Sequence, residues 1–374
     1  MNFEFSEQQQ FIRDQARNFL AQECTTQTVR AVLDTDAAFD GDLWRNIVEL
    51  GWTAMAIPEE HGGLGLGYLE LCVIAEELGR ALAPVPFSSS VYLATEAIKR
   101  WGSAEQQQQY LPGLATGELI GTLAHWEGLG GVPGGNNNRG KDGARSSDGK
   151  LSGCKWPVAD GDSANFAITS ARDESGELRL FILDLEQASV TRQALSSVDP
   201  SRSQARLDFD GSSAVALGDG TVGESELAQL LDSAAILLAF EQIGGCQAAM
   251  DSGIAYTRER YAFGRPVASF QAIKHKFADM FVALELARSN AYYGAWALSC
   301  DAPDLPLAAA TARVSAGDAF YLISKENIQA HGGMGFTWEF DCHLYYRRAQ
   351  LLSAQVGTAP HWKNLVAQRL LHAA

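Results

Sequence analysis

The order in which helical and β-type segments follow each other constrains the fold of this chain more than any other feature. Apolar residues recur at helical spacing in the first third, short β-type runs separated by turn residues fill the middle, and helical spacing returns in the last part. This order predicts an α+β protein of several domains, because a length of 374 residues with 46% hydrophobic residues suffices for a large core. We expect a helical domain at residues 1–119, a β-domain at 120–221 and a helical bundle at 222–374.

Local signals in the N-terminal part indicate where helices begin and end. Ser6 is expected to cap one helix, and Gly51 is expected to stop another. Helical spacing resumes over residues 69–82, and we expect the adjacent acids Glu76 and Glu77 to lie on the solvated face of that helix.

The middle part has the pattern of a small β-domain. Its β-type runs predict strands at Phe166–Ser170, Leu178–Asp184, Ser189–Arg192 and Ala205–Asp210. Before these strands lies Gly128–Gly143, a segment rich in glycine and asparagine, which is typical of a flexible loop.

Two long helices are predicted in the last part. One runs from Leu227 to about Arg260, and the other runs from about Gln271 to Ser299. The second helix repeats apolar residues on one face, namely Ile273, Phe277, Met280, Phe281 and Leu284. Apolar faces of this width predict that the bundle forms the core of an oligomer, because a monomer would expose them to water.

Charge and cysteine content exclude several classes of partner. The formal net charge of −16 at pH 7 repels phosphates and anionic lipids, so we expect neither nucleic acid nor a membrane as partner. The six cysteines show no Cys-x-x-Cys pair and no metal spacing, which predicts reduced core thiols and no metal site. The first residues are polar and acidic, unlike a signal peptide, and no run of about 18 apolar residues follows. We therefore expect a soluble, cytoplasmic protein.

Two segments of the last part resemble those of a known family. The first is similar to the hallmark segment of the flavin-dependent acyl-CoA dehydrogenases and consists of Tyr256-Thr-Arg-Glu-Arg-Tyr-Ala-Phe-Gly-Arg-Pro-Val-Ala-Ser-Phe-Gln-Ala-Ile-Lys-His-Lys-Phe-Ala-Asp-Met280. The second resembles the family's Gln-x-x-Gly-Gly run with its arginine-rich helix and consists of Gln329-Ala-His-Gly-Gly-Met-Gly-Phe-Thr-Trp-Glu-Phe-Asp-Cys-His-Leu-Tyr-Tyr-Arg-Arg348. The resemblance implies a helical domain, a β-domain and a C-terminal four-helix bundle, assembly as tetramers, and FAD as cofactor. Residues 336–348 are similar to a bacterial branch that contains heteromeric α2β2 dehydrogenases acting on CoA thioesters of steroid side chains.

The resemblance implies that these segments hold the ADP end of an FAD bound mainly by a neighbouring subunit. The matching positions are Arg260, Phe263, Phe270, Gln271, Gln329, Gly332 and Gly333. A guanidinium offers paired donors to pyrophosphate oxygens, and adjacent glycines let backbone N–H groups approach an anion. The alternative is that Arg260 pairs with a surface acid and that the two glycines form only a tight turn.

The other half of the family's flavin site, which holds the isoalloxazine ring, is altered in this sequence. Its first strip corresponds to Leu123-Ala-His-Trp-Glu-Gly128, where the indole of Trp126 would be bulky beside a flavin, and its Gly-Ser-Asp is lost in the loop that follows. The second strip keeps Trp156, but Pro157 has no backbone donor and Val158 has no hydroxyl. This half-site is therefore interpreted as degraded.

Neither position at which the family carries its catalytic base holds a carboxylate. The position before Gly-Thr is Val356, and the alternative position on the long upstream helix is Ala234, next to Ala235 at a position that often holds a CoA-contacting arginine. Dehydrogenation needs a carboxylate that takes the α-proton while a hydride leaves for the flavin. Glu241, about 10.5 Å beyond Ala234 on the same helix face, is the candidate base, although we favour a packing role for it. Glu339 is interpreted as an acid at an interface or at the start of a helix. The histidines His275, His331 and His343 are interpreted as structural hydrogen-bond donors.

Three functions are compatible with a sequence that keeps the ADP-binding half of the flavin site but has an altered isoalloxazine half and no carboxylate at the usual base positions. In the first, the chain is the non-catalytic partner of a paralogous acyl-CoA dehydrogenase subunit in an α2β2 assembly that oxidises an acyl-CoA, and it supplies the ADP-binding half of the FAD site. In the second, the chain forms a homotetramer that uses Glu241 as base. In the third, it is a flavin-free scaffold. We expect the first.

Overall fold

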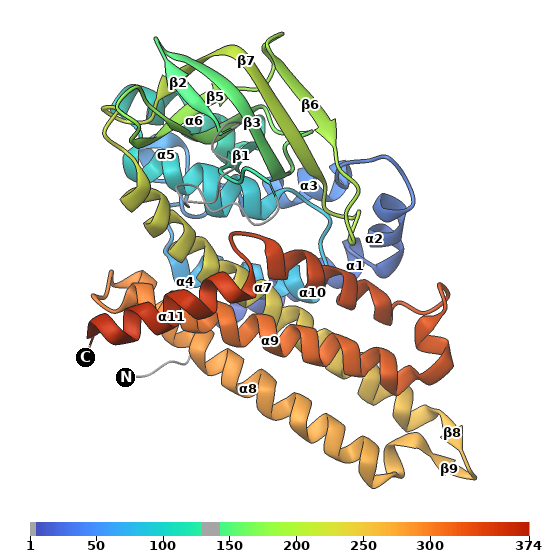
Figure 1. Ribbon diagram of the computed structural model, residues 1–374. Coiled ribbons are helices and arrows are strands. Elements are labelled where there is room, and N and C mark those ends of the chain that lie inside the picture. Colours follow the sequence, from blue (N-terminus) through green and yellow to red (C-terminus); the bar gives the residue numbers. More distant parts are fainter. Residues whose placement is uncertain (1–4, 129–142, 374) are drawn as a thin grey trace. The chain divides into compact units, whose positions relative to one another are not determined.

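The computed structural model describes residues 5–128 and 143–373, which belong to two compact units (Figure 1). The helical unit contains the residues up to Ala31, Gly67–Ala83 and the residues from Ala235 onwards, and the mixed unit contains Val32–Leu66 and Pro84–Ala234. The predicted order of helical, β and helical segments is confirmed. The predicted boundaries of three domains remain predictions, and most of the predicted loop Gly128–Gly143 lies outside the described residues.

The mixed unit is built on one seven-stranded sheet. Its strands are β1 (Gly121–Ala124), β2 (Arg145–Ser147), β3 (Lys150–Ala159), β4 (Phe166–Arg172), β5 (Leu178–Asp184), β6 (Val190–Ala194) and β7 (Gln204–Ala216). The order β1-β4-β2-β3-β7-β5 closes on itself because β5 also pairs with β4, and β6 lies beside β7. All predicted runs are strands, and inward residues such as Leu151, Val158 and Leu207 are fully buried.

Short helices accompany this sheet in the mixed unit. They are α3 (Gly41–Glu49), η1 (Glu59–His61), the π-helical η2 (Ser88–Thr95), α5 (Glu96–Trp101) and α6 (Ala104–Ala115), while α2 (Thr26–Leu33) is shared between the two units. Gly51 follows α3 with a φ of 76°, which confirms its predicted role as a stop. Gly121 opens β1 against η2, where an added Cβ would lie 2.4 Å from the Cβ of Ala94. Glycine is therefore required for this contact.

The helical unit consists mainly of long helices. These are α1 (Glu7–Glu23), α4 (Tyr68–Arg80), α7 (Glu224–Glu259), α8 (Gln271–Ser299), α9 (Leu305–His331), α10 (Cys342–Ala354) and α11 (Ala359–Ala373), with the short elements β8 (Tyr261–Ala262), β9 (Arg265–Pro266), η3 (Val267–Ser269) and η4 (Gly332–Phe336). The side chain of Ser6 accepts a bond from the backbone of Gln9, so the predicted cap is confirmed. An 18-residue window of α7 is apolar enough to cross a membrane, but 83% of this window is buried inside the protein. α7 is therefore a core helix, and its first residues belong to the mixed unit.

Helices α4 and α7 touch through their backbones. An added Cβ on Gly79 would lie 1.9 Å from the carbonyl oxygen of Glu241, and one on Gly244 would lie 1.9 Å from that of Glu76. This crossing leaves Glu76 and Glu77 buried, so the prediction that they are solvated is wrong.

The two buried acids are paired with arginines of α1. Glu76 lies 3.2 Å from Arg13, and Glu77 lies 2.6 Å from Arg17. Burial raises the pKa of Glu76, while the charge of Arg13 opposes this shift. All six cysteines lie among the described residues and none of them forms a disulfide there, but Cys300 is exposed, so the expectation of core cysteines is wrong at that position.

Candidate functional site

The structure brings the two family-like segments into direct contact. Tyr256 of α7 stacks on His331 at the end of α9, with ring centroids 4.2 Å apart. Phe340 packs edge-on against Tyr256 at 5.7 Å, and the imidazole Nδ1 of His331 lies 2.8 Å from the backbone oxygen of Asn327. Burial lowers the pKa of His331. The stack therefore fixes the end of α9 against the end of α7.

The same end of the helical unit carries a hairpin whose tip is an exposed aromatic residue. Strands β8 and β9 are joined by Phe263 and Gly264, which have φ values of 52° and 78°. A two-residue turn with positive φ at both positions suits the twist of a hairpin. The side chain of Phe263 is 97% exposed, and the guanidinium of Arg265 lies 4.0 Å above the ring of Phe270.

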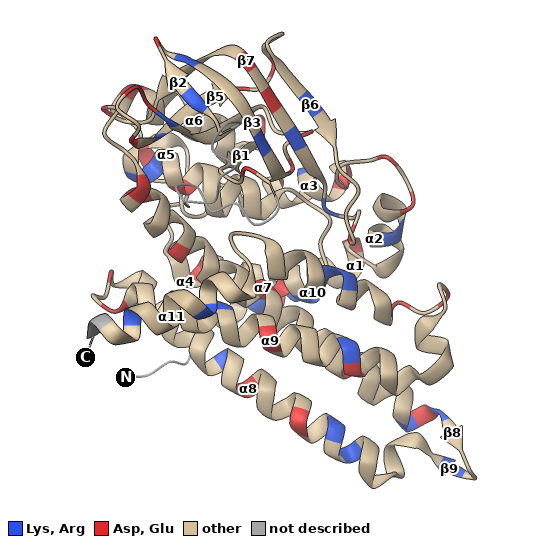
Figure 2. Cartoon of the chain, in the orientation of Figure 1, with Lys and Arg blue, Asp and Glu red and all other residues tan. Residues whose placement is uncertain are grey.

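Polar residues of the predicted ADP half lie exposed beside this hairpin. Arg260 is exposed and has no ion pair with any described residue, so its predicted alternative partner, a surface acid, is not found in that part of the chain. Gln271, at the start of α8, is exposed as well. Figure 2 shows basic residues on and beside β8 and β9.

The glycines after α9 have different conformational needs. Gly332 ends α9 with φ 60° and ψ −139°, a region that is essentially limited to glycine, and a side chain would meet no neighbour there. Gly333 has ordinary φ and is exposed, again with open space beside it. Gln329, three residues before Gly332, is also exposed. Their accessible backbone leaves room for a ligand.

Contacts between helices place these residues at one end of the helical unit. Lys276 of α8 forms an ion pair with Glu326 of α9. An added Cβ on Gly253 of α7 would lie 2.8 Å from Asn327 of α9 and 3.2 Å from Phe277 of α8. The end of α7, the start of α8 and the end of α9 therefore meet. The seven residues predicted for the ADP half lie in these helices or in the segments that follow α7 and α9.

The mixed unit brings the two predicted flavin strips together. Glu127 and Trp156 form a parallel bridge, the N–H of Gly128 donates to the carbonyl of Trp156 at 2.8 Å, and the N–H of Trp156 donates to that of Trp126 at 2.9 Å. Trp156 is half-buried, whereas Val158 is completely buried. Val158 therefore contributes to the core of the sheet.

A buried ion pair that the sequence analysis did not predict holds the strips together. Lys155 of β3 is completely buried, and its Nζ lies 2.5 Å from Glu127 and 3.1 Å from the hydroxyl of Ser170. Glu127 also accepts a bond of 3.1 Å from the backbone N–H of Ala144. Burial lowers the pKa of Lys155, and Glu127 opposes that shift. A lysine at the centre of a β-type run is the sequence signal from which this buried ion pair could have been predicted.

The candidate base Glu241 lies deep inside the helical unit. Its side chain is 2% exposed, and its backbone touches Gly79 of α4. Its negative charge acts on Arg313 of α9, which is also buried. Arg313 was not singled out from the sequence, because its partners are far from it along the chain.

The two usual base positions are buried as well. Ala234 and Ala235 of α7 are completely buried, and Val356 is 2% exposed between α10 and α11. Val356 has a φ of 53°, which is rare for a β-branched residue. The positions provide no carboxylate to a substrate.

The loop after η4 is hydrogen-bonded to Arg30 of α2. Arg30 donates to Asp341 at 2.7 Å and to the backbone oxygen of Trp338 at 2.7 Å. The ring of Trp338 stacks on His343 with centroids 4.7 Å apart, while Glu339 is exposed. Burial lowers the pKa of His343, with help from nearby arginines. His275 is exposed at the start of α8.

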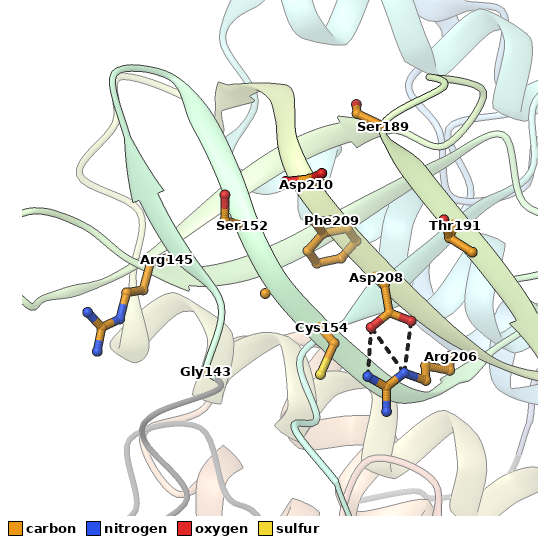
Figure 3. A pocket seen from close by; sticks show the side chains of 11 residues that line it. Gly143, Arg145, Ser152, Cys154, Ser189, Thr191, Arg206, Asp208, Phe209 and Asp210 are labelled. Atoms are coloured by element: carbon orange, nitrogen blue, oxygen red, sulfur yellow. Dashed lines mark hydrogen bonds and ion pairs between the residues drawn. The ribbon is translucent and has the colours of Figure 1, made fainter.

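An open groove of about 560 Å³ crosses the solvated face of the sheet (Figure 3). Strands β3, β6 and β7 line it with small polar residues, and Arg206 binds Asp208 through both of its oxygens. None of the residues predicted to bind flavin lines the groove. The described residues also contain no group of three or more His, Cys, Asp or Glu suited to a metal ion.

Comparisons with known proteins agree over nearly the whole chain. Residues 6–118 match the sequence profile of the acyl-CoA dehydrogenase N-terminal domain, and residues 225–371 match that of the acyl-CoA dehydrogenase C-terminal domain. The chain is 33% identical over 355 residues to the acyl-CoA dehydrogenase IpdE2 of Mycobacterium tuberculosis. This alignment covers 95% of this chain and 94% of that protein.

Solved structures show the same fold. A chain in the ChsE4-ChsE5 complex from Mycobacterium tuberculosis superposes with a TM-score of 0.89 at 26% identity, over 99% of both chains. A chain of the Tcur3481-Tcur3483 steroid ACAD superposes with a TM-score of 0.88 at 29% identity, over 98% of both chains.

Proposed function

This chain belongs to the acyl-CoA dehydrogenase family of FAD-dependent oxidoreductases that act on the CH–CH bond of acyl-CoA, and from this premise we propose that it is the non-catalytic subunit of a heteromeric dehydrogenase. In this assembly it supplies the ADP-binding half of an FAD site, and a paralogous subunit supplies the isoalloxazine half and the base.

One observation carries this proposal. The residues that match the family's ADP-binding positions lie at one exposed end of the helical unit, and Arg260 has no ion pair with a described residue. An exposed guanidinium beside accessible glycine backbone fits a diphosphate, because it offers paired, charge-assisted donors without displacing an existing partner. The exposed ring of Phe263 offers a flat apolar surface in addition.

The proposed roles of the residues follow from their chemistry. When bound, FAD accepts the hydride that leaves the β-carbon of the acyl-CoA. Arg260 would bind diphosphate oxygens, the amides of Gln271 and Gln329 would bind ribose or phosphate oxygens, and the backbone of Gly332 and Gly333 would allow close approach. Phe270 and its contact with Arg265 would hold the hairpin in place. Trp156, in the mixed unit, would lie beside the isoalloxazine ring in the other half of a flavin site.

The proposed partner supplies what this chain lacks. Val356 and Ala234 are apolar, and the candidate acid, Glu241, is 2% exposed and acts electrostatically on Arg313. A general base must reach the α-proton of the substrate, so a buried acid of this kind is unsuited to the role. The α-proton would therefore be taken by the paralogous subunit.

Features of the chain and of its relatives support the assembly. On α8, Phe281, Val282 and Leu286 are more than half exposed, as expected for a face that another subunit covers. The similar ChsE4-ChsE5 and Tcur3481-Tcur3483 proteins are named for two different components, and the latter is a steroid ACAD. We propose a cytoplasmic α2β2 assembly that oxidises CoA thioesters of steroid side chains.

Purification of the chain alone and together with its paralogue tests the proposal. The chain alone should be colourless, and the coexpressed pair should show flavin absorbance and oxidise an acyl-CoA. A flavin-loaded, active homotetramer would support a homomeric enzyme instead, and a colourless, inactive pair would support a scaffold; either result would contradict the proposal.

A further inference from the structure

Helices α7 and α9 lie side by side in the helical unit and run in the same direction, towards β8 and β9 (Figure 1). Along this α7–α9 seam, a glycine of one helix faces a larger side chain of the other at three points. The three pairs are Gly245 with Phe320, Gly253 with Asn327 and Gln242 with Gly317. In each pair the α9 residue lies 74 or 75 positions after the α7 residue, so the three contacts belong to one register of two parallel helices.

The three glycines of the seam differ in the space beside them. A Cβ added to Gly245 would lie 2.4 Å from the ring of Phe320, and one added to Gly253 would lie 2.8 Å from the side-chain oxygen of its partner. A Cβ added to Gly317 would lie 3.6 Å from its partner, which is an ordinary van der Waals distance. The first two contacts therefore need glycine, whereas the third has room for alanine.

Asn327 is an unusual residue for such a contact. It is completely buried, and neither the oxygen nor the nitrogen of its amide has a hydrogen-bond partner among the described residues. A buried amide of this kind costs stability. Its oxygen faces Gly253 of α7, and the ring of Phe277 of α8 would lie 3.2 Å from the same added Cβ. The amide therefore acts through its shape, as a spacer where three helices meet.

This contact lies close to the ends of both helices. Gly253 and Asn327 each belong to the last two turns of their helix. The backbone oxygen of Asn327 lies 2.8 Å from Nδ1 of His331, and the ring of His331 stacks on that of Tyr256 in α7. Asn327 thus contacts α7 through its side chain and fixes the stacked histidine through its backbone. The separation of the two helix ends depends on this residue.

We infer that Gly253 and Asn327 are positioning residues of the ADP-binding surface, because their contact sets the distance between Arg260, which follows α7, and Gly332, which ends α9. A hydrogen bond tolerates a change in length of only a few tenths of an ångström. A diphosphate that needs donors from both helix ends is therefore bound less tightly when their separation changes. The inference rests on the proposed function, since it requires one FAD to contact both ends.

The variant G253A tests the spacing in the coexpressed assembly. Its new methyl group presses on Asn327 and Phe277, and a flip of the amide does not relieve this, because the nitrogen then takes the place of the oxygen. Alanine favours a helix more than glycine does, so the protein should fold with a melting temperature lowered by roughly 2–6 °C. Its affinity for FAD should fall about fivefold or more. Turnover at saturating FAD should remain that of the wild type, because the proposed partner supplies the base.

Two further variants provide a rescue and a matched control. The double variant G253A/N327A removes the amide that the new methyl group meets, so its affinity for FAD should return to within about twofold of the wild type. G317A adds the same methyl group to the same seam at the point where there is room for it. It should keep the wild-type affinity for FAD and raise the melting temperature by about 2 °C.

Wild-type affinity for FAD in G253A, whatever its melting temperature, would make the contact merely structural and overturn the inference. A double variant without recovery of affinity, or an equal loss in G317A, would overturn it as well. The variant R260A separates the inference from the proposed function. If R260A loses affinity and G253A does not, only the positioning role fails. If R260A binds FAD as the wild type does, the proposed function fails and the inference fails with it.

Discussion

Two regions of the helical unit differ in the burial and hydrogen bonding of their polar residues. At the β8–β9 end, Arg260, Gln271 and Gln329 are exposed, and Arg260 has no ion pair with a described residue. At the α10–α11 connection, Arg313 is buried and its donors are occupied by Gln242 and two backbone carbonyls. Exposed, unoccupied donors suit a ligand that arrives from outside, whereas occupied donors stabilise the chain itself. We therefore interpret the β8–β9 region as a binding surface and the surroundings of Arg313 as a structural part of the core.

The largest effect should come from removing the buried arginine. R313M removes the donor that Arg313 provides to the oxygens of Gln242, Leu352 and Gln355, so the free energy of unfolding should fall by about 3 kcal/mol or more. R260M should change it by less than about 0.5 kcal/mol, because Arg260 is exposed. Urea unfolding of both variants measures this. Equal losses would contradict the distinction between the two regions.

The next effect concerns retention of flavin by the coexpressed assembly. R260A should weaken it by about 10- to 100-fold, since charge-assisted hydrogen bonds are worth roughly 1.5–3 kcal/mol. The matched control is R45A, which removes another exposed arginine, one that pairs only with Asp42 among the described residues. Titration of the apo assembly with FAD gives both affinities. Wild-type affinity in R260A would remove Arg260 from the site.

The long helices were predictable from the sequence because their signals are local. The apolar spacing placed the end of α7 and the start of α8 within a few residues. The burial of Glu76 and Glu77 was not predictable in this way, because Arg13 and Arg17 lie about 60 positions away in the sequence.

The same limit applies to the candidate site. The positions of Arg260, Gln329 and Gly332 follow from recognisable segments, and their shared location follows from helix contacts that no single segment encodes. Lys155 and Arg313 were missed because their partners are distant in sequence. The positive φ of Val356 could not be foreseen, since valine normally avoids that conformation.

A smaller effect is expected from the two glycines after α9. G332A should cost about 1–2 kcal/mol in the free energy of unfolding, because alanine does not tolerate φ 60° with ψ −139°. G333A has ordinary φ and open space, so it should leave stability unchanged. Flavin affinity of the two variants, measured in the assembly, then shows whether backbone shape or side-chain bulk matters at the binding surface. Equal stability of the two variants would contradict the assigned backbone strain.

The smallest effect is expected for E241Q. Turnover of the active assembly should fall by less than about tenfold, because Glu241 is buried and acts on Arg313. Removal of a true general base commonly costs about 10²–10⁴-fold. Turnover is measured per folded assembly, with circular dichroism as the control for folding. A loss of about 10³-fold with substrate binding retained would make Glu241 the base.

The division of labour between the subunits is tested by counting FAD in the purified assembly with its paralogue. Absorbance of the released flavin, divided by the amount of tetramer from light scattering, gives the stoichiometry. If this chain lends only the ADP-binding half of each site, there is one FAD for each partner subunit, and therefore half as many flavins as chains. One FAD for every chain would show that this subunit seats a flavin ring of its own, and would contradict the proposed role.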